Sequence, residues 1–369
     1  MTINQNDVIE FKGIIAIGPL VGLPSSDWVG VDIANYLSYT GVQVEKFSSF
    51  DKRVEADIII LVKLMPSMQW LIDKVERGIK ILYAPVDIFH SNYIYWRYRY
   101  RLKLFSGFLI HNDKVGELIS KTSNSPLFFI EHYLKYALDS DNSSEKNNEL
   151  LWVGHLEYIP SLLKFLKEDK PNVKIRALSD LEKLPHYENY LRVSLAAFGS
   201  KYILENKSEE GAYISDVYIE QWSEKKQAEL MRTCIAAFDT KMNSFAHNLK
   251  PPTKAQKFIY NKIPFACSDY SFSFKYFQDR GLRVAKLNEI DYLVSPEYRQ
   301  KISKFCDLQK WRVSIDSVAS TYLDACEKSV KIKSISKIFF RFMDFVNFNI
   351  YFMLRIIDKL KIILNINKG

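Results

Sequence analysis

Two lysines one helical turn apart, at the start of a helix, are a pattern that can hold an anion. Lys250 and Lys254 lie in LKPPTKAQKFIYNKIPFACSD (249–269), on either side of a Pro-Pro-Thr. The prolines favour helix entry, and the free N–H groups of a helix N-terminus attract negative charge. We therefore predict that Lys250, Thr253 and Lys254 bind a phosphate or diphosphate without a metal ion. The alternative is that both lysines are ordinary solvated surface residues.

The elements that must position these lysines follow an alternation of strand and helix. In the first 137 residues, apolar runs such as GIIAIGP (13–19) predict strands that are buried on both faces. The alternation resumes at residue 150 and includes CIAAFD (234–239), the strand that leads towards Lys250. This order predicts an α/β fold with two Rossmann-like, doubly wound domains that face each other across a cleft.

A polar stretch, LDSDNSSEKNNE (138–149), separates the two halves and is predicted to be an inter-domain linker. We accordingly assign residues 1–137 to an N-terminal acceptor-side domain and residues 150–330 to a C-terminal donor domain. Residues 331–369 form a basic amphipathic tail. The stretch DLQKWRVSIDSVASTYLDACEK (307–328) is expected to form one helix.

The composition agrees with a globular protein and limits the chemistry. Apolar residues make up 47% of the 369 residues, charged residues 25%, and the formal net charge is +8. The four cysteines form no C-x-x-C pair and the six histidines show no metal-ligand spacing, so we expect a reducing compartment and no structural metal. No basic segment precedes the first apolar run, so we do not expect a signal peptide.

Four stretches resemble GT-B glycosyltransferases. One of them, WSEKKQAELMRTCIAAFD (222–239), is similar to the helix and strand that precede their donor loop. CIAAFDTKMNSFAHNLKPPTKAQKFIYNKIPFACSD (234–269) resembles their donor-binding region, with an Asp-ended strand, a loop, a Lys-x-x-x-Lys helix start, a Pro turn and a strand ending in Ser. LLWVGHLEYIPSLLKFLKE (150–168) is similar to their first donor-domain strand, turn and helix. GPLVGLPSSDWVGVDIANYLSYTGVQVE (18–45) is similar to their first acceptor-domain loop and helix. The residues that keep the donor-region order are Lys250, Lys254, Pro264 and Ser268.

The resemblance implies sugar transfer from a nucleotide-sugar donor, with Gly154, His155 and Ser268 near the donor phosphates. His155 could equally be an ordinary strand-end residue. The chain departs from the family where many retaining members have a ribose-binding Glu, here Lys257, and where a glycine precedes the turn, here Lys262. The donor and the inverting or retaining outcome stay open. The alternative function is a catalytically inactive GT-B-like scaffold that binds a partner or a membrane.

An inverting reaction also needs a base for the proton of the acceptor hydroxyl. Asp27, after the first-strand loop, is the leading candidate, and its alternative role is to cap a helix. Asp87 and His90, in APVDIFHS after the fourth strand, are expected at the same cleft. His132, at the end of the sixth strand, is a weaker third candidate.

The run YIYWRYRYRLKLF (93–105) interleaves arginines with aromatic residues, as in some nucleic-acid sites. It could be an edge strand with a basic face or a helix that carries Arg97 and Arg101 on one side. Residues 331–369 carry eight basic and two acidic residues, a net charge of +6, so the rest of the chain is nearly balanced. We therefore expect no nucleic-acid partner and assign the run to a basic patch on the acceptor or membrane side.

The tail segment KIFFRFMDFVNFNIYFMLRIIDKLKIIL (337–364) predicts an amphipathic helix with a narrow polar stripe. Its longest uncharged stretch, 345–354, is too short to cross a bilayer, which takes about 20 apolar residues. We expect it to lie in a membrane interface, with a helix docked on the protein core or a dimer contact as alternatives.

Taken together, these features predict a bacterial glycosyltransferase of surface-polysaccharide or lipopolysaccharide synthesis. It would use a nucleotide-sugar as co-substrate, without a metal or other cofactor, and act on a glycan or lipid-linked acceptor. We expect it in the cytoplasm, peripheral on the inner face of the cell membrane.

Overall fold

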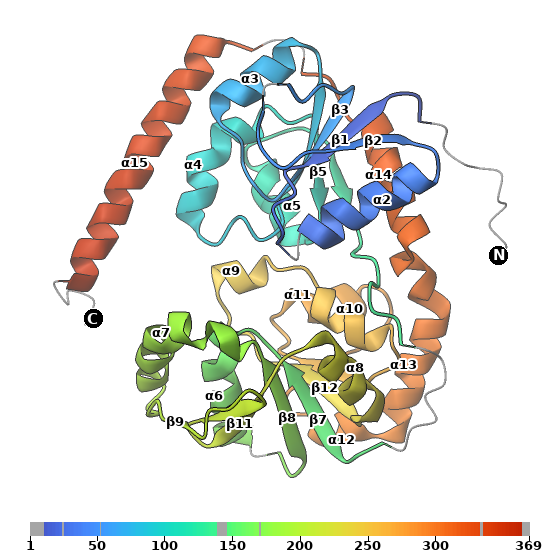
Figure 1. Ribbon diagram of the computed structural model, residues 1–369, viewed down its shortest axis with the longest axis vertical. Helices are drawn as coiled ribbons and strands as arrows, with labels where there is room; N and C mark the ends of the chain where they lie inside the picture. The colour runs from blue at the N-terminus through green and yellow to red at the C-terminus, as the bar shows by residue number, and fades with distance from the viewer. Residues whose placement is uncertain are drawn as a thin grey trace. The chain divides into compact units, whose positions relative to one another are not determined.

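The computed structural model describes residues 11–23, 26–51, 53–138, 146–169, 171–332 and 335–363. These residues form two compact units of strands and helices (Figure 1). The first unit contains Met1–Tyr133, Leu249–Pro251 and Trp311–Gly369, and the second contains Leu134–Asn248 and Pro252–Lys310. Most of the predicted linker at 138–149 lies outside the described residues, because 139–145 are not among them.

The first unit is built on a parallel sheet with the strand order β2-β1-β3-β4-β5-β6. Every residue of the central strand β3 is buried, as a strand covered by helices on both faces requires. The predicted doubly wound half is therefore confirmed. The elements are β1 (Ile14–Gly18), η1 (Asp27–Val31), α2 (Asp32–Tyr39), β2 (Gln43–Lys46), β3 (Ile58–Val62), α3 (Met68–Glu76), β4 (Lys80–Ala84), α4 (Asn92–Leu102), β5 (Gly107–Ile110), α5 (Asp113–Ser120) and β6 (Leu127–Phe129).

The second unit has a sheet with the order β14-β13-β12-β7-β8-β11-β10-β9. It is parallel from β14 to β11, and β10 and β9 extend it in antiparallel fashion. Its strands are β7 (Glu149–Val153), β8 (Lys174–Ser179), β9 (Leu204–Glu205), β10 (Gly211–Ile214), β11 (Val217–Gln221), β12 (Ala236–Asp239), β13 (Phe265–Cys267) and β14 (Ala285–Lys286). Its helices are η2 (Leu156–Tyr158), α6 (Ile159–Asp169), η3 (Leu181–Lys183), α7 (Leu184–Ala197), α8 (Glu224–Thr233), α9 (Phe245–Asn248), α10 (Thr253–Ile259), α11 (Phe272–Gln278), α12 (Ile290–Val294) and α13 (Pro296–Gln309).

The stretch 307–328 differs from the expected single helix. Helix α13 ends at Gln309, a short 3-10 turn η4 (Lys310–Val313) follows, and α14 (Ile315–Lys328) begins after the N-cap Ser314. The apolar face of α14 lies in the core of the first unit, where the Tyr322 hydroxyl donates to the carbonyl of Val29 at 3.1 Å. The assignment of residues 311–330 to the C-terminal domain is therefore wrong, because these residues complete the core of the other unit.

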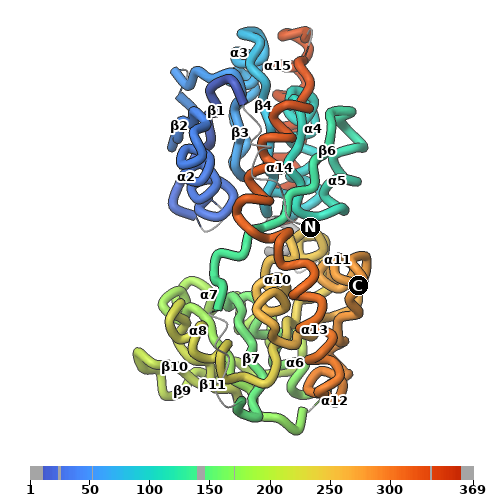
Figure 2. Tube along the Cα trace, turned by 90° about the vertical axis from the view of Figure 1, so that its right-hand side faces the viewer, coloured from blue at the N-terminus to red at the C-terminus, as the bar shows by residue number. Residues whose placement is uncertain are grey.

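The tail forms a single long helix, α15 (Lys337–Ile363), which packs along α4 and α3 of the first unit (Figures 1 and 2). The predicted amphipathic helix is present. Within the part of the chain that the structure describes, no helix combines the length and apolarity needed to cross a membrane.

Candidate functional site

A buried carboxylate with two ammonium groups lies at the carboxyl edge of the second unit's sheet. Asp239 is the last residue of β12 and only 4% exposed. Lys254 Nζ, from the first turn of α10, lies 2.6 Å from its Oδ1, and Lys241 Nζ, from the loop after β12, lies 3.3 Å from its Oδ2. Burial alone would raise the pKa of Asp239, but the two ammonium groups hold it at about 2.

Aromatic rings surround the Lys254 ammonium. Nζ lies 5.8 Å from the centroid of the Trp152 ring and 5.6 Å from that of Tyr158. The indole N–H of Trp152 donates to the Thr240 hydroxyl at 3.1 Å and so links β7 to the loop after β12. Strands β7 and β12 are neighbours, and ligands of open parallel sheets bind outside such strand ends.

A hollow of about 390 Å³ opens beside this edge. Helix α6 lines one side, and the chain after β12, including Lys241 and Asn243, lines another. The hydroxyl of Tyr270 donates to the carbonyl of Lys241 at 2.6 Å. Of the two lysines paired with Asp239, Lys241 lines this hollow, whereas Lys254 is not among its lining residues.

One of the two lysines that the structure pairs differs from those that the sequence singled out. Helix α10 begins at Thr253, as expected, and Lys250 precedes it. Lys250 groups with the first unit, where Asn112 Nδ2 donates to its carbonyl at 2.9 Å. Within the second unit, the ammonium groups that Asp239 brings together belong to Lys241 and Lys254. Lys241 was missed, although it follows the Asp-ended strand by two residues.

The turn after β7 has a local role in the sheet. The N–H of Gly154 donates to the carbonyl of Leu178 at 3.0 Å, so it is not available to a phosphate. A Cβ at position 154 would lie 2.2 Å from the ring of Trp152, which explains why glycine is needed there. His155 precedes η2, and its Nδ1 accepts from the N–H of Glu157 at 3.4 Å. The N–H of Gly154 therefore serves the sheet, and the approach of this residue to the donor phosphates stays a prediction.

Ser268 follows β13 directly and is half-buried. Strand β13 lies next to β12, so Ser268 is at the same sheet edge as Asp239. Its role at the donor stays a prediction.

The acceptor-side candidates follow strands of the first unit. Asp27 is half-buried and begins η1. Asp87 is exposed after β4, with a left-handed φ of 55°, a conformation in which a non-glycine residue is strained. His90 is exposed, and its Nδ1 lies 3.1 Å from the carbonyl oxygen of Ile88. Strained backbone of this kind occurs often at functional sites, which favours Asp87 among the three.

Two histidines at the ends of β5 and β6 form a buried pair. The rings of His111 and His132 lie 4.2 Å apart, and both side chains are buried. His111 Nδ1 lies 2.8 Å from the carbonyl oxygen of Ile130, whereas neither ring nitrogen of His132 has a hydrogen-bond partner among the described residues. Burial lowers the pKa of His111 to about 4, and burial together with His111 lowers that of His132. Such neutral imidazoles are weak bases, which counts against His132 as the base.

Comparison with known proteins identifies the architecture. No protein-family model and no curated protein sequence matches the chain. Solved structures do match. Anabaena Alr3699/HepE in complex with UDP-glucose aligns with a TM-score of 0.55 and 9% identity, over 86% of this chain and 100% of that one. AviGT4, a glycosyltransferase involved in avilamycin A biosynthesis, aligns with a TM-score of 0.53 and 10% identity, over 86% and 98%. WaaG, a glycosyltransferase involved in lipopolysaccharide biosynthesis, aligns with a TM-score of 0.50 and 11% identity, over 84% of this chain and 98% of that one. The chain has the GT-B glycosyltransferase fold.

The two GT-B departures noted in the sequence have different physical consequences. Lys262 has a φ of 59°, the left-handed conformation that glycine adopts readily. Lys257 lies in α10, one turn after Lys254, with its ammonium 5.2 Å from the centroid of the Tyr136 ring. Burial and the charge of Lys254 lower the pKa of Lys257 to about 8. An ammonium here cannot accept ribose hydroxyl protons as a carboxylate does.

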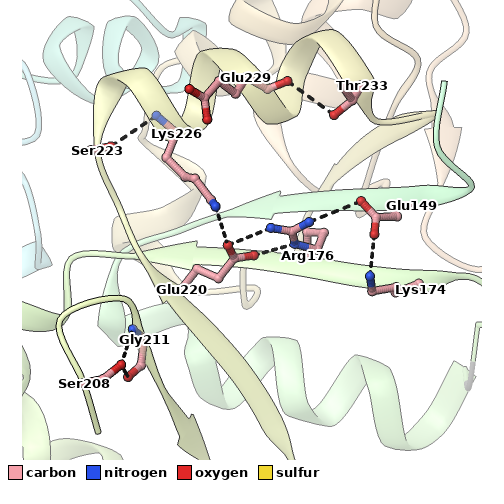
Figure 3. Close-up of polar contacts among 10 residues, drawn as sticks. All are labelled: Glu149, Lys174, Arg176, Ser208, Gly211, Glu220, Ser223, Lys226, Glu229 and Thr233. Atoms are coloured by element: carbon pink, nitrogen blue, oxygen red, sulfur yellow. Dashed lines mark hydrogen bonds and ion pairs between the residues drawn. The ribbon is translucent and has the colours of Figure 1, made fainter. Parts of the chain in front are cut away.

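A second polar cluster, on β7, β8, β11 and α8 of the second unit, has a structural role. Figure 3 shows Arg176 between the carboxylates of Glu149 and Glu220. Arg176 and Glu220 also line a hollow whose volume is about 860 Å³, whereas Glu149 is not part of its lining. Arg176 Nη2 lies 2.7 Å from Glu220 Oε2, Lys226 Nζ lies 3.1 Å from the same oxygen, and Lys174 Nζ lies 2.6 Å from Glu149 Oε1. Burial alone would raise the pKa of Glu220, but hydrogen bonds from Arg176 and Lys226 hold it below its usual value. These three cations and two carboxylates tie β7, β8, β11 and α8 together and leave a net charge of +1.

The buried histidine pair predicts acid sensitivity. The pKa of His111 is about 4 in the folded protein and 6.5 when unperturbed, so the unfolded chain binds more protons between these values. Stability is therefore complete above pH 6.5 and lost as the pH falls towards 4. At pH 5, His111 alone should lower the free energy of unfolding by about 2 kcal/mol, and His132 should add to this loss. Urea unfolding at pH 7.5 and pH 5 measures the difference.

The variant His111→Phe should reduce this pH dependence, whereas His90→Phe, at an exposed histidine, should keep it. An equal loss of stability between the two pH values in both variants would contradict the assignment.

The left-handed backbone of Lys262 gives a second prediction. Lys262→Gly should raise the free energy of unfolding by about 1 kcal/mol relative to Lys262→Ala, because alanine keeps the strain that glycine relieves. Both variants lose the exposed Lys262–Asp307 ion pair, with its Nζ–Oδ1 distance of 2.6 Å, so the comparison isolates the backbone effect. Chemical denaturation of the two variants provides the measurement, and an alanine variant as stable as the glycine variant would count against it.

Proposed function

We propose that the protein transfers a sugar from a nucleotide-sugar donor to a hydroxyl group of a glycan or lipid-linked acceptor. The observation that carries this proposal is the pair of ammonium groups on Asp239 at the carboxyl edge of one sheet of a GT-B fold. In the reaction the bond between the sugar C1 and the diphosphate oxygen breaks, and its electron pair stays on the diphosphate. The acceptor oxygen bonds to C1 and loses its proton.

The paired lysines suit the leaving group. Lys241 and Lys254 bring two positive charges against the single negative charge of Asp239, so the triad has a net charge of +1. Positive charge that is already in place stabilises negative charge that develops on the departing phosphate. We propose that these side chains make a metal ion unnecessary and that chelation leaves the reaction unaffected.

The acceptor is proposed to approach the strand ends of the first unit, where Asp87 is held in a strained conformation and where Asp27 and His90 also follow strands. Asp87 is the preferred base if the reaction inverts the sugar. WaaG is described as acting in lipopolysaccharide biosynthesis, which supports a surface-glycan acceptor here. We place the reaction in the cytoplasm, at the inner face of a bacterial cell membrane.

The donor site can be tested by ligand-dependent thermal stability. Because the matching HepE structure contains UDP-glucose, UDP and UDP-glucose are the first probes, followed by GDP and CMP. A ligand that binds only the folded state raises the melting temperature as its concentration exceeds Kd. Lys254→Ala should weaken this binding about 10- to 100-fold, since a hydrogen bond to a charged group contributes about 1.5–3 kcal/mol.

Lys301→Ala is the matched control, because Lys301 pairs with Glu297 on an exposed face of α13 in the same unit. It should bind the nucleotide like the wild-type protein. Failure of every nucleotide to stabilise the wild-type protein would reject the donor assignment. An equal response of both variants would move the site away from Asp239.

A further inference from the structure

Helix α15 is amphipathic, but its polar side faces the protein. Arg101 of α4 donates from Nε and Nη2 to the two carboxylate oxygens of Asp344, at 2.7 Å each. Asn347, one turn later, is fully buried, and its Nδ2 donates to the carbonyl of Trp96 at 3.3 Å. A helix on the surface of a globular protein normally buries its apolar face and exposes its polar one. In α15 the polar side chains of Asp344 and Asn347 lie on the packed side, while large apolar side chains are exposed.

Further contacts between α15 and α4 extend this polar interface, which is formed by Arg101, Asp344 and Asn347. The Arg97 guanidinium lies 4.9 Å from the ring centroid of Phe348 and 5.0 Å from that of Tyr351. Arg99 Nη2 lies 3.4 Å from Asn347 Oδ1. At the start of the helix, Lys337 Nζ forms an ion pair of 2.6 Å with Glu76 of α3. Because these anchors span several turns, they determine which side of α15 faces outward.

The outward side of α15 is mostly apolar. The exposed amide in its main row belongs to Asn349, which donates to the carbonyl of Phe345 at 2.8 Å. Ile338 is 85% exposed, Phe345 66% and Phe342 60%. These positions share one side of the helix with two later residues, Phe352 and Ile356, because they recur at helical spacing. The exposed large apolar residues of α15, among those the structure describes, are Ile338, Phe339, Phe342, Phe345, Phe348, Ile350, Phe352, Met353, Ile356 and Ile357. A patch of this extent on a soluble surface marks an interaction site.

We propose that this face of α15 docks on the surface of an anionic lipid bilayer. The charge around the face fits that partner. Arg341 and Arg355 are exposed on α15, at the margins of the apolar side, where headgroup phosphates would lie. Helix α4 beside it contains no acidic residue, and its arginines contact α15 itself. Tyr93, Trp96 and other aromatic side chains of α4 are of the type enriched at membrane–water interfaces.

A bilayer surface fits the shape of the face as well. The apolar positions run from Ile338 to Ile357, so the helix would lie flat with its long axis in the membrane plane. Charged residues at 344, 355 and 358 interrupt the sequence and oppose a transmembrane orientation. This docking would hold the first unit at the membrane. It does not depend on the donor site, although it would bring the proposed reaction to lipid-linked acceptors.

Vesicle binding by the full chain tests the proposal. The wild-type protein should co-sediment with vesicles of mixed phosphatidylglycerol and phosphatidylcholine, and much less with phosphatidylcholine alone, and salt should weaken the binding. The triple variant Phe342→Ser, Phe345→Ser and Phe352→Ser should bind at least about tenfold less, because each substitution removes apolar area from the contact. The double variant Val193→Ser and Leu308→Ser changes exposed apolar residues of the second unit and should bind like the wild type.

A local probe covers the case in which the triple variant folds poorly. The four native cysteines are buried, so Phe345→Cys and the control Leu308→Cys can each be labelled with an environment-sensitive fluorophore. The emission at position 345 should shift to the blue with anionic vesicles, and that at position 308 should not.

Three results would overturn the proposal. The first is wild-type protein that ignores anionic vesicles, and the second is equal vesicle binding by the triple and the control variants. The third is a wild-type protein that sediments as a dimer while the triple variant sediments as a monomer, because the apolar face of α15 would then bind a second copy of the chain. Nucleotide binding is measured in a separate experiment, so rejection of the proposed donor site would not change the interpretation of vesicle binding.

Discussion

The arrangement of the candidate site depends on a carboxylate that is buried at the end of a central strand. An isolated carboxylate in that position would be very costly, and Asp239 is tolerated because two ammonium groups come to it. One of them comes from the loop that leaves β12, and the other from α10, thirteen residues further along the chain. The ion pairs therefore order the segment after β12 and at the same time leave one net positive charge at the carboxyl edge of the sheet.

The same physical rule determines the orientation of α15. Arg101 and Asp344 are only 12% and 14% exposed, so neither could be left unpaired without a large cost. Their bidentate contact, together with buried Asn347, makes the polar stripe the packed side of the helix. At Asp239 and at Asp344, a charged group is desolvated and paired with a specific partner. This pairing determines the character of the surface next to it. At Asp239 that surface is cationic, and on α15 it is apolar.

Much of the fold could be predicted from the sequence, because buried parallel strands such as β1 and β3 are unbroken apolar runs. The break between α13 and α14 could not, because helical periodicity shows which face is apolar but not which unit will cover it. The role of Lys254 at the donor stays a prediction, but the residue itself was singled out from spacing. Lys241 was not, because its importance comes from the burial of Asp239, which spacing does not reveal. Gly154 was expected to serve a ligand, whereas the ring of Trp152 accounts for it.

The arginine-rich run of α4 and the tail helix look unrelated in sequence, since about 240 positions separate them. Considered alone, the alternation of Arg and aromatic residues in α4 is compatible with nucleic-acid binding. In the structure Arg97, Arg99 and Arg101 contact α15 through the Phe348 and Tyr351 rings, Asn347 and Asp344. The two sequence patterns therefore form the two sides of one interface, between α4 and α15. Because the arginines serve to hold the helix, the feature of this region that calls for a partner is the apolar face of α15.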